Sequence, residues 1–459
     1  MVFMKKILLL LTTTIFLMSQ DINLNKSKVY WLDLVHNKKY DTLDKELNNL
    51  QKRYEQNPED EKLLRYAICS FQNSDPDLED EIKGWIEHNP DSIYAHLALG
   101  EYFLNLGWLS RGNRFIKYTR REQIENMIKY FKIAFEDYDW VLMHNKKVSL
   151  AYAREIFMVQ NYNYAKKIFE TGLKNNPLSL NIREAFAYKN LSKWTEYSIS
   201  KDKTNYKIIQ DLIEKTKPLY NKNSKLKDFE GYLDYAKSDD YILQEKYDKA
   251  LKAINSAIKK SPTYLNFNQR GLIYWHLGQK DKALKDFTKS LELFPNETSL
   301  YVNRGKLYMS LNKNNLALND FNKALKLDML NPQALYFKAS IEYSQGKKDI
   351  AIIDFLDSLK YDKYNYSTYE YLSYYKYYNE KNYKNALFYA NKAIEFGSKD
   401  SGVFYIKTAS EWQLHNCEFV KSAYKYKDIC QKEGNSCDSK NLNWAIKSAE
   451  FAKSRGICK

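Results

Sequence analysis

Small and aromatic residues recur along the second half of the chain at the spacing of one helix face. Ala283, Phe287 and Ser290 stand at i, i+4 and i+7, and the same arrangement returns every 34 residues. Positions i, i+4 and i+7 share one face of an α-helix, and a further small residue precedes each set on an earlier helix, so each unit is predicted to be a helical hairpin. The four columns are Gly271, Gly305 and Ala339; Ala283, Ala317 and Ala351; Phe287, Phe321 and Phe355; and Ser290, Ala324 and Ser358.

The 34-residue period and the small, small, aromatic, small columns over residues 264–365 resemble the tetratricopeptide repeat (TPR) family. Looser units continue the pattern on both sides, and another spans about 146–179. The resemblance implies an all-α fold: an α-solenoid of TPR-like helical hairpins with an N-terminal helical domain.

The N-terminal part carries a different pattern. Gly100, Gly107-Trp108 and Arg111-Gly112 precede a long amphipathic stretch, residues 124–142. This arrangement resembles an uncharacterised bacterial helical domain that has no assigned activity. Trp108 and Arg111 are candidates for a site, but we favour a Trp packed between helices and an Arg bound at a helix end.

The start of the chain has the pattern of an export signal. Lys5 and Lys6 precede an apolar run, residues 7–18, which is typical of a signal peptide and is shorter than the roughly 20 residues of a membrane span. We therefore expect export to the periplasm or outside the cell, with an uncleaved anchor as the alternative. The predicted segments are 1–20 signal peptide, 21–200 N-terminal helical domain, 201–228 Lys-rich join, 229–400 TPR array and 401–459 Cys-containing helical cap.

Four of the 5 cysteines lie close to the end of the chain, which supports export because disulfides persist in oxidising compartments. Four cysteines allow three pairings, and we favour Cys430 with Cys437 and Cys417 with Cys458. A zinc site would show closer pairs than these spacings offer. Cys69 lies alone among apolar neighbours and is expected to be a buried free thiol.

Motifs for catalysis or cofactor binding are absent from the sequence. It contains no dinucleotide-binding or phosphate-binding glycine loop, no H-E-x-x-H zinc motif and no G-x-S-x-G nucleophile motif. We therefore expect no enzyme activity, no cofactor and no metal. The alternative is a periplasmic enzyme or enzyme subunit with a site in the N-terminal domain around Trp108 and Arg111.

The net charge of +15 does not point to nucleic acid. Only 11 of the 72 basic residues are Arg, which base recognition favours, and the segment 55–91 is acidic, with eleven acids against three bases. We expect no nucleic-acid partner. Contact with an anionic membrane or cell-wall surface remains a weaker alternative.

The expected partner is a protein or peptide held on the concave face of the solenoid, which the first helix of each TPR unit lines. Tyr and Trp at these positions offer apolar area and a hydrogen-bonding tip. The alternative is that several of the tyrosines stack between repeats. The predicted partner-binding residues are Asn268, Leu272, Trp275, Lys306, Tyr336, Tyr343, Tyr371 and Tyr375.

Overall fold

The computed structural model describes residues 26, 28–111, 120–159, 161–190, 205–433 and 437–458. These residues form α-helices and short 3₁₀ helices, with no strand, which confirms the all-α prediction. Among the helices of these ranges, none combines the length and apolar character that crossing a membrane requires. The predicted signal peptide lies outside the described residues.

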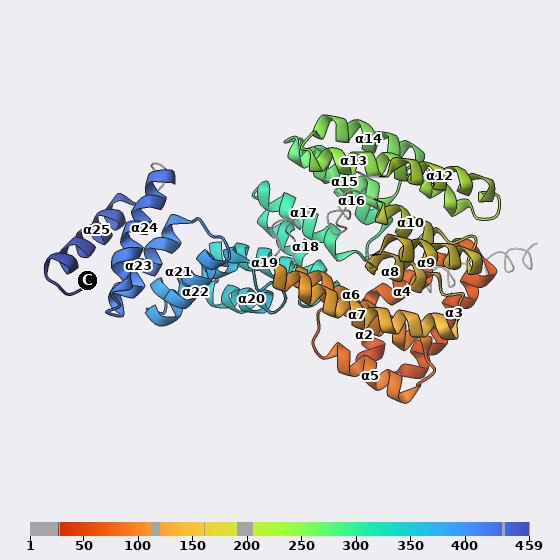
Figure 1. Cartoon of the computed structure of the whole chain (residues 1–459), viewed down its shortest axis with the longest axis horizontal. Coiled ribbons are helices and arrows are strands. Elements are labelled where there is room, and N and C mark those ends of the chain that lie inside the picture. The colour runs from red at the N-terminus through yellow and green to blue at the C-terminus, as the bar shows by residue number, and fades with distance from the viewer. Residues whose placement is uncertain are drawn as a thin grey trace, which may run out of the picture. The chain divides into compact units, whose positions relative to one another are not determined.

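The chain divides into two compact units, residues 1–329 and 330–459. The domain boundaries expected from the sequence remain predictions. Unit 1 begins with α2 (Lys28–His36), α3 (Tyr40–Gln56), α4 (Glu61–Ile68) and α5 (Leu78–His88), with the short 3₁₀ helices η1 (Pro58–Asp60) and η2 (Cys69–Phe71) on either side of α4 (Figure 1).

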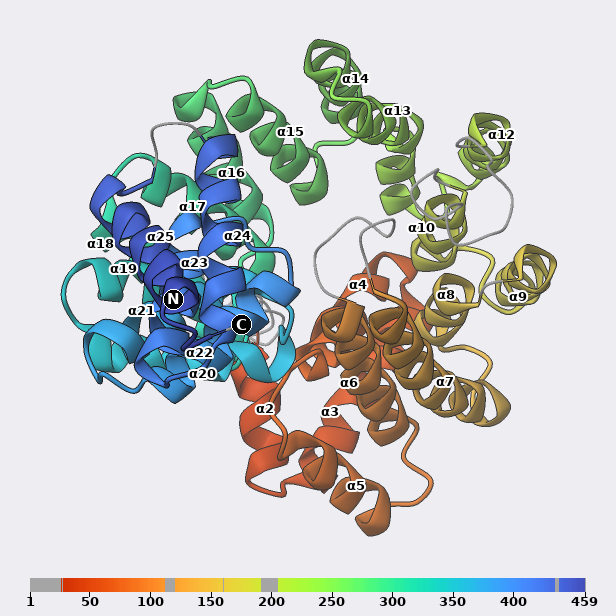
Figure 2. The same cartoon turned by 60° about the vertical axis from the view of Figure 1, so that its left-hand side comes forward.

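The remainder of unit 1 consists of paired helices that follow one another along the chain (Figure 2). They are α6 (Ile93–Arg111) with α7 (Arg121–His144), α8 (Ser149–Met158) with α9 (Tyr162–Asn175), α10 (Leu180–Lys189) with α12 (Tyr206–Thr216), α13 (Tyr232–Leu243) with α14 (Tyr247–Lys260), α15 (Tyr264–His276) with α16 (Lys280–Leu293), and α17 (Thr298–Ser310) with α18 (Asn314–Leu327).

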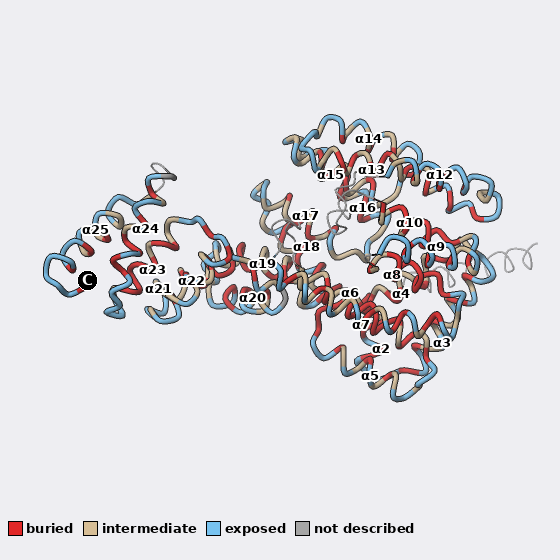
Figure 3. Tube along the Cα trace, viewed as in Figure 1, coloured by how far each residue is buried: buried red, intermediate tan, exposed pale blue. Residues whose placement is uncertain are grey.

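Unit 2 continues with the same kind of hairpin and ends on a single helix. Its helices are α19 (Pro332–Ser344), α20 (Lys348–Tyr361), α21 (Tyr366–Tyr378), α22 (Tyr383–Glu395), α23 (Ser401–Gln413), α24 (Glu418–Glu433) and α25 (Ser439–Ser454). In both units buried positions alternate with exposed ones along each helix, as expected of amphipathic pairs (Figure 3).

The described part of the predicted Lys-rich join is packed helix. Ile209, Leu212 and Ile213 on α12 are buried, and α12 contacts both α10 and α13. Two short 3₁₀ helices, η4 (Lys217–Leu219) and η5 (Ser224–Phe229), complete the connection to α13. The apolar face of α12 therefore continues the core from one hairpin to the next.

Six hairpin turns share one backbone feature. Each contains a residue with positive φ, a conformation that favours Gly and that Asn tolerates. The six lie 33–35 residues apart, so the repeat extends from α13 to α24 and includes the first hairpin of the predicted cap. They are Glu245, Gly278, Asn312, Gly346, Lys381 and His415.

The small and aromatic columns of the sequence pack against each other inside each hairpin. Phe287 and Phe321 are fully buried, and a Cβ atom added at Gly271 or Gly305 would lie 2.7 or 2.6 Å from the facing Phe ring. Glycine thus lets the first helix approach the second closely enough to enclose the ring.

A column of ion pairs with the same 34-residue period joins the two helices of three hairpins. Arg270 contacts Asp286 at 2.6 and 2.8 Å, and Arg304 contacts Asp320 at 2.7 and 2.8 Å. Lys338 pairs with Asp354 at the equivalent place. The sequence analysis missed this column, although its spacing of 16 residues within each repeat is visible in the sequence.

Candidate functional site

The eight predicted partner-binding residues all fall on first helices of repeat hairpins. Four belong to α15 and α17 in unit 1, and four belong to α19 and α21 in unit 2. Each is partly buried, so each retains some accessible surface. Their role in binding a partner remains a prediction.

The four residues of unit 1 connect two neighbouring repeats. The Lys306 ammonium lies 5.9 Å from the ring centre of Trp275, and Asn303 donates a hydrogen bond of 3.1 Å to the side-chain oxygen of Asn268. Leu272 and Trp275 pack on the core of their own hairpin. Burial lowers the pKa of Lys306, in keeping with its position beside an indole ring.

Three of the four tyrosines in unit 2 stack around one buried ring. The ring centre of Phe355 lies 4.7 Å from Tyr371 and 5.8 Å from Tyr336, while Tyr343 and Tyr371 are 5.2 Å apart. These residues therefore stack between helices, as the alternative interpretation expected. Tyr375 donates a hydrogen bond from its hydroxyl to Asp349.

In unit 1, α4 packs against the first helices of later hairpins. Glu61, which is only 4% exposed, accepts hydrogen bonds from the Ser149 hydroxyl at 2.6 Å and from the backbone N–H groups of Leu180 and Asn181 at 2.6 and 3.1 Å. The Ser179 hydroxyl also donates to it. The carboxylate of Glu61 thus satisfies free N–H groups at the start of α10.

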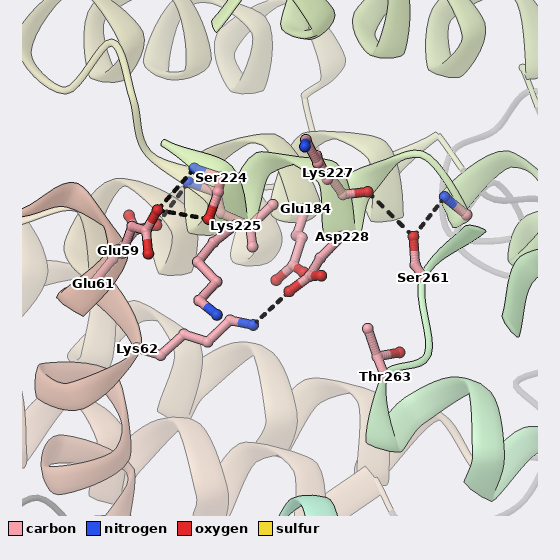
Figure 4. Close-up of polar contacts among 12 residues, drawn as sticks. Glu59, Glu61, Lys62, Glu184, Ser224, Lys225, Lys227, Asp228, Ser261 and Thr263 are labelled. Atoms are coloured by element: carbon pink, nitrogen blue, oxygen red, sulfur yellow. Dashed lines mark hydrogen bonds and ion pairs between the residues drawn. The ribbon is translucent and has the colours of Figure 1, made fainter. Parts of the chain in front are cut away.

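Further contacts hold α4 and η1 against the segment around η5 (Figure 4). Lys62 pairs with Asp228 at 3.1 Å, and the carboxylate of Glu59 accepts from the backbone N–H and the hydroxyl of Ser224 at 3.0 and 2.6 Å. The aromatic ring of Tyr66 on α4 lies 4.4 Å from that of Phe294. The segment of residues 59–66 therefore occupies a surface that several hairpins share.

Cys69 ends α4 inside a buried polar network. Glu101, which is 0% exposed, receives hydrogen bonds from Arg154 at 2.6 and 3.0 Å and from the Tyr138 hydroxyl at 3.0 Å. Arg154 also lies 3.1 Å from the Cys69 sulfur. Burial, with the charge of Glu101, raises the pKa of Cys69 to about 11, so the thiol stays protonated at neutral pH and is a poor nucleophile.

A cavity of about 190 Å³ lies beside this network, between α4, α8, α10, α13 and α15. Its lining joins charged and amide groups to apolar side chains. Sequence reasoning missed the cavity because its residues come from five helices and share no motif. They include Arg65, Arg154, Asn181, Glu184, Tyr232 and Leu265.

Trp108 lies between helices, as we favoured. Its ring makes edge contacts with Phe131 at 5.1 Å and with Phe157 at 5.3 Å, and the Arg111 guanidinium lies 5.7 Å from it. In the ranges that the structure describes, no group of three or more His, Cys, Asp or Glu side chains is arranged to hold a metal ion.

The four C-terminal cysteines lie at disulfide distance in the favoured pairing. Cys417 joins Cys458 with their Cα atoms 5.4 Å apart, and Cys430 joins Cys437 with their Cα atoms 5.5 Å apart. Cys69 is a free cysteine, as expected. The first bond ties the end of the chain to the loop before α24.

Family models match two regions of the chain. Two models described as tetratricopeptide repeat match residues 267–297 and 302–367, and one described as domain of unknown function (DUF4034) matches residues 29–127. The last match covers the region that resembles an uncharacterised bacterial helical domain. No curated protein matches the chain.

Solved structures of helical repeat proteins resemble the chain at low identity. The Cut9–Hcn1 hetero-tetramer of APC/C is 13% identical over 91% of this chain and 95% of that one, with a TM-score of 0.46. PilW, a type IV pilus biogenesis factor, is 22% identical over 47% and 98%, with a TM-score of 0.39. A tetratricopeptide repeat protein from Parabacteroides merdae is 17% identical over 54% and 91%, with a TM-score of 0.34.

Proposed function

We propose that this chain, which carries tetratricopeptide repeats at residues 267–297 and 302–367, is an exported, non-catalytic scaffold that binds a protein or peptide partner. The observation that carries the proposal is the surface of α15 and α17, where Trp275 and Lys306 lie side by side and both keep accessible area. An indole beside a cation can bury apolar area and pair with an acidic or carbonyl group of a partner.

Export is supported by the apolar run of residues 7–18 and by the two cysteine pairs near the C-terminus. A non-catalytic role is supported by the protonated state of the Cys69 thiol and by the packing of Trp108 between aromatic rings. The Lys-rich composition argues against a nucleic-acid partner, and contact with an anionic membrane or cell-wall surface is a weaker possibility that high salt would abolish.

The test is in vivo crosslinking of three variants, followed by identification of the crosslinked protein. Trp275→Ala removes the indole, and Lys306→Glu reverses the charge beside it. Lys289→Glu is the matched control, because Lys289 lies on the second helix of the α15/α16 hairpin and is exposed. We expect the first two variants to lose the crosslinked partner and the control to retain it. Equal capture by all three folded variants, verified by circular dichroism, would refute the proposed surface.

Export is tested separately by fractionating the expressing cells and alkylating free thiols under non-reducing conditions. We expect one alkylated cysteine, Cys69, after unfolding, in protein recovered from the envelope or medium. Five alkylated cysteines in exported protein would contradict the disulfide assignment, and retention in the cytoplasm would contradict export.

A further inference from the structure

The cavity between α4, α8, α10, α13 and α15 contains hydrogen-bond donors that the protein does not use. Asn181 is only 4% exposed, and its side-chain oxygen accepts a hydrogen bond of 3.1 Å from Arg65. This contact fixes the orientation of the amide, because the opposite orientation would turn its NH₂ group toward a cation. Nδ2 of Asn181 then has no partner among the described residues, although a buried unpaired donor is costly.

Two guanidinium groups in the lining also have N–H groups to spare. Arg65 uses only Nη1, which contacts Asn181 and Glu184, the latter at 3.2 Å. Arg154 uses Nε and Nη2 for Glu101 and Cys69. Within the described parts of the chain, Nε and Nη2 of Arg65 and Nη1 of Arg154 therefore remain available to a ligand.

The two arginines are close enough to repel each other. The pKa of Arg65 lies above its usual value: burial lowers it, Glu184 raises it, and the charge of Arg154 acts to lower it. An anionic group between the two would relieve this repulsion. Glu184 and Glu101 already pair with the two arginines, so the local charge sums to zero and favours a ligand with one negative charge over one with two.

The opposite wall of the cavity is apolar. Leu150, Ala153, Phe157 and Ala185 line it, together with Leu265, which is 42% exposed although it is a large hydrophobic residue. A volume of about 190 Å³ is comparable with cavities that hold one aromatic ring, for which roughly 150 Å³ suffices. A ligand of this size would cover the exposed leucine and leave its polar end beside the arginines.

We propose that this cavity binds a carboxylate carried on a compact apolar group, with its oxygens accepting from Asn181, Arg65 and Arg154. The apolar body lies against Phe157 and Leu265. A free organic acid and the terminal residue of a peptide both supply this chemistry. The site lies on α4, α8 and α10, away from the surface of α15 and α17 proposed above, so either can fail without the other.

The experiment measures binding to the full mature chain by isothermal titration calorimetry. The probes are 3-phenylpropionate, its neutral amide, and a hexapeptide ending in Phe with a free or an amidated C-terminus. We expect the carboxylate form of at least one pair to bind and its amide to bind at least about ten-fold more weakly, which corresponds to about 1.4 kcal/mol. Binding of the free acid alone assigns a small-molecule source, and binding of the peptide alone assigns a chain end.

Two variants and one control test the location. Asn181→Asp keeps the acceptor for Arg65 but replaces the unused donor with a negative charge, and Leu265→Trp fills the cavity from its exposed side. Asn161→Asp makes the same charge change at an exposed helix cap. We expect the first two to abolish carboxylate binding and the control to bind as the unmodified chain does. Equal binding of acid and amide, no binding of any probe, or unchanged binding by the folded Leu265→Trp variant would overturn the proposal.

Discussion

Removing the buried carboxylate of Glu61 is expected to destabilise unit 1 strongly. The carboxylate accepts four hydrogen bonds, from the hydroxyls of Ser149 and Ser179 and from the N–H groups of Leu180 and Asn181. Glu61→Ala leaves these donors without an acceptor in a place that water does not reach. α4 also loses its attachment to the start of α10.

The magnitude follows from the number and kind of bonds lost. A hydrogen bond to a charged group contributes about 1.5–3 kcal/mol, and four bonds to one group are far from additive because its burial opposes them. We expect Glu61→Ala to lower the free energy of unfolding by about 3–5 kcal/mol. Glu61→Gln keeps the shape and one acceptor oxygen, so its loss is expected to be smaller, about 2 kcal/mol.

Two measurements check this expectation. Urea unfolding followed by circular dichroism gives the overall loss, and hydrogen exchange of the backbone N–H groups of Leu180 and Asn181 reports the contact itself. Glu59→Ala is the control, since Glu59 binds Ser224 on the surface and its removal is expected to change little. If Glu61→Ala unfolds at the same urea concentration as the control, or if exchange at the start of α10 is unchanged, the reasoning is wrong.

Three further predictions concern the rest of the chain. Burial raises the pKa of Glu155 to about 8, so the protonated form stabilises the fold below about pH 4.5 and this stability is lost as the pH rises through 8; Glu155→Gln should therefore raise the melting temperature at pH 9, by up to about 4 kcal/mol of stability, and change it little at pH 4. Gly305→Ala places a methyl group about 2.6 Å from the Phe321 ring and should cost about 1–3 kcal/mol in urea unfolding, whereas a stabilised variant would contradict the close approach of the two helices. Replacing Cys417 and Cys458, which lie 41 residues apart, by Ser should destabilise unit 2 by about 4 kcal/mol in calorimetry, and an unchanged transition would contradict the bond.

Much of the repeat architecture could be predicted because its determinants are local. A small residue such as Gly271 must face a large one such as Phe287 within 16 residues of chain, so the pairing leaves a periodic trace in the sequence. The aromatic residues on the first helices were also predictable in position. Their packing was not, because only the structure shows that Tyr371 stacks on Phe355 across a repeat boundary.

The role of α4 and the cavity could not be predicted from the sequence. Glu61 meets partners 88–120 residues later in the chain, and no period or motif connects them. The cavity depends on an amide whose donor is unused, which is a property of three-dimensional packing and not of residue spacing. Both features arise where helices from distant parts of unit 1 converge.

The packing of α4 also has a consequence for how the chain acquires its structure. In a simple repeat array each hairpin contacts only its neighbours, so folding can begin anywhere and spread. Here the contact of Ser74 with Asp328 joins residues 254 apart, and Glu61 is synthesised well before the α10 groups that it binds. Such non-local contacts slow folding and make it more cooperative. Unit 1 is therefore expected to unfold as one block, and deleting a single internal repeat should weaken regions far from the deletion.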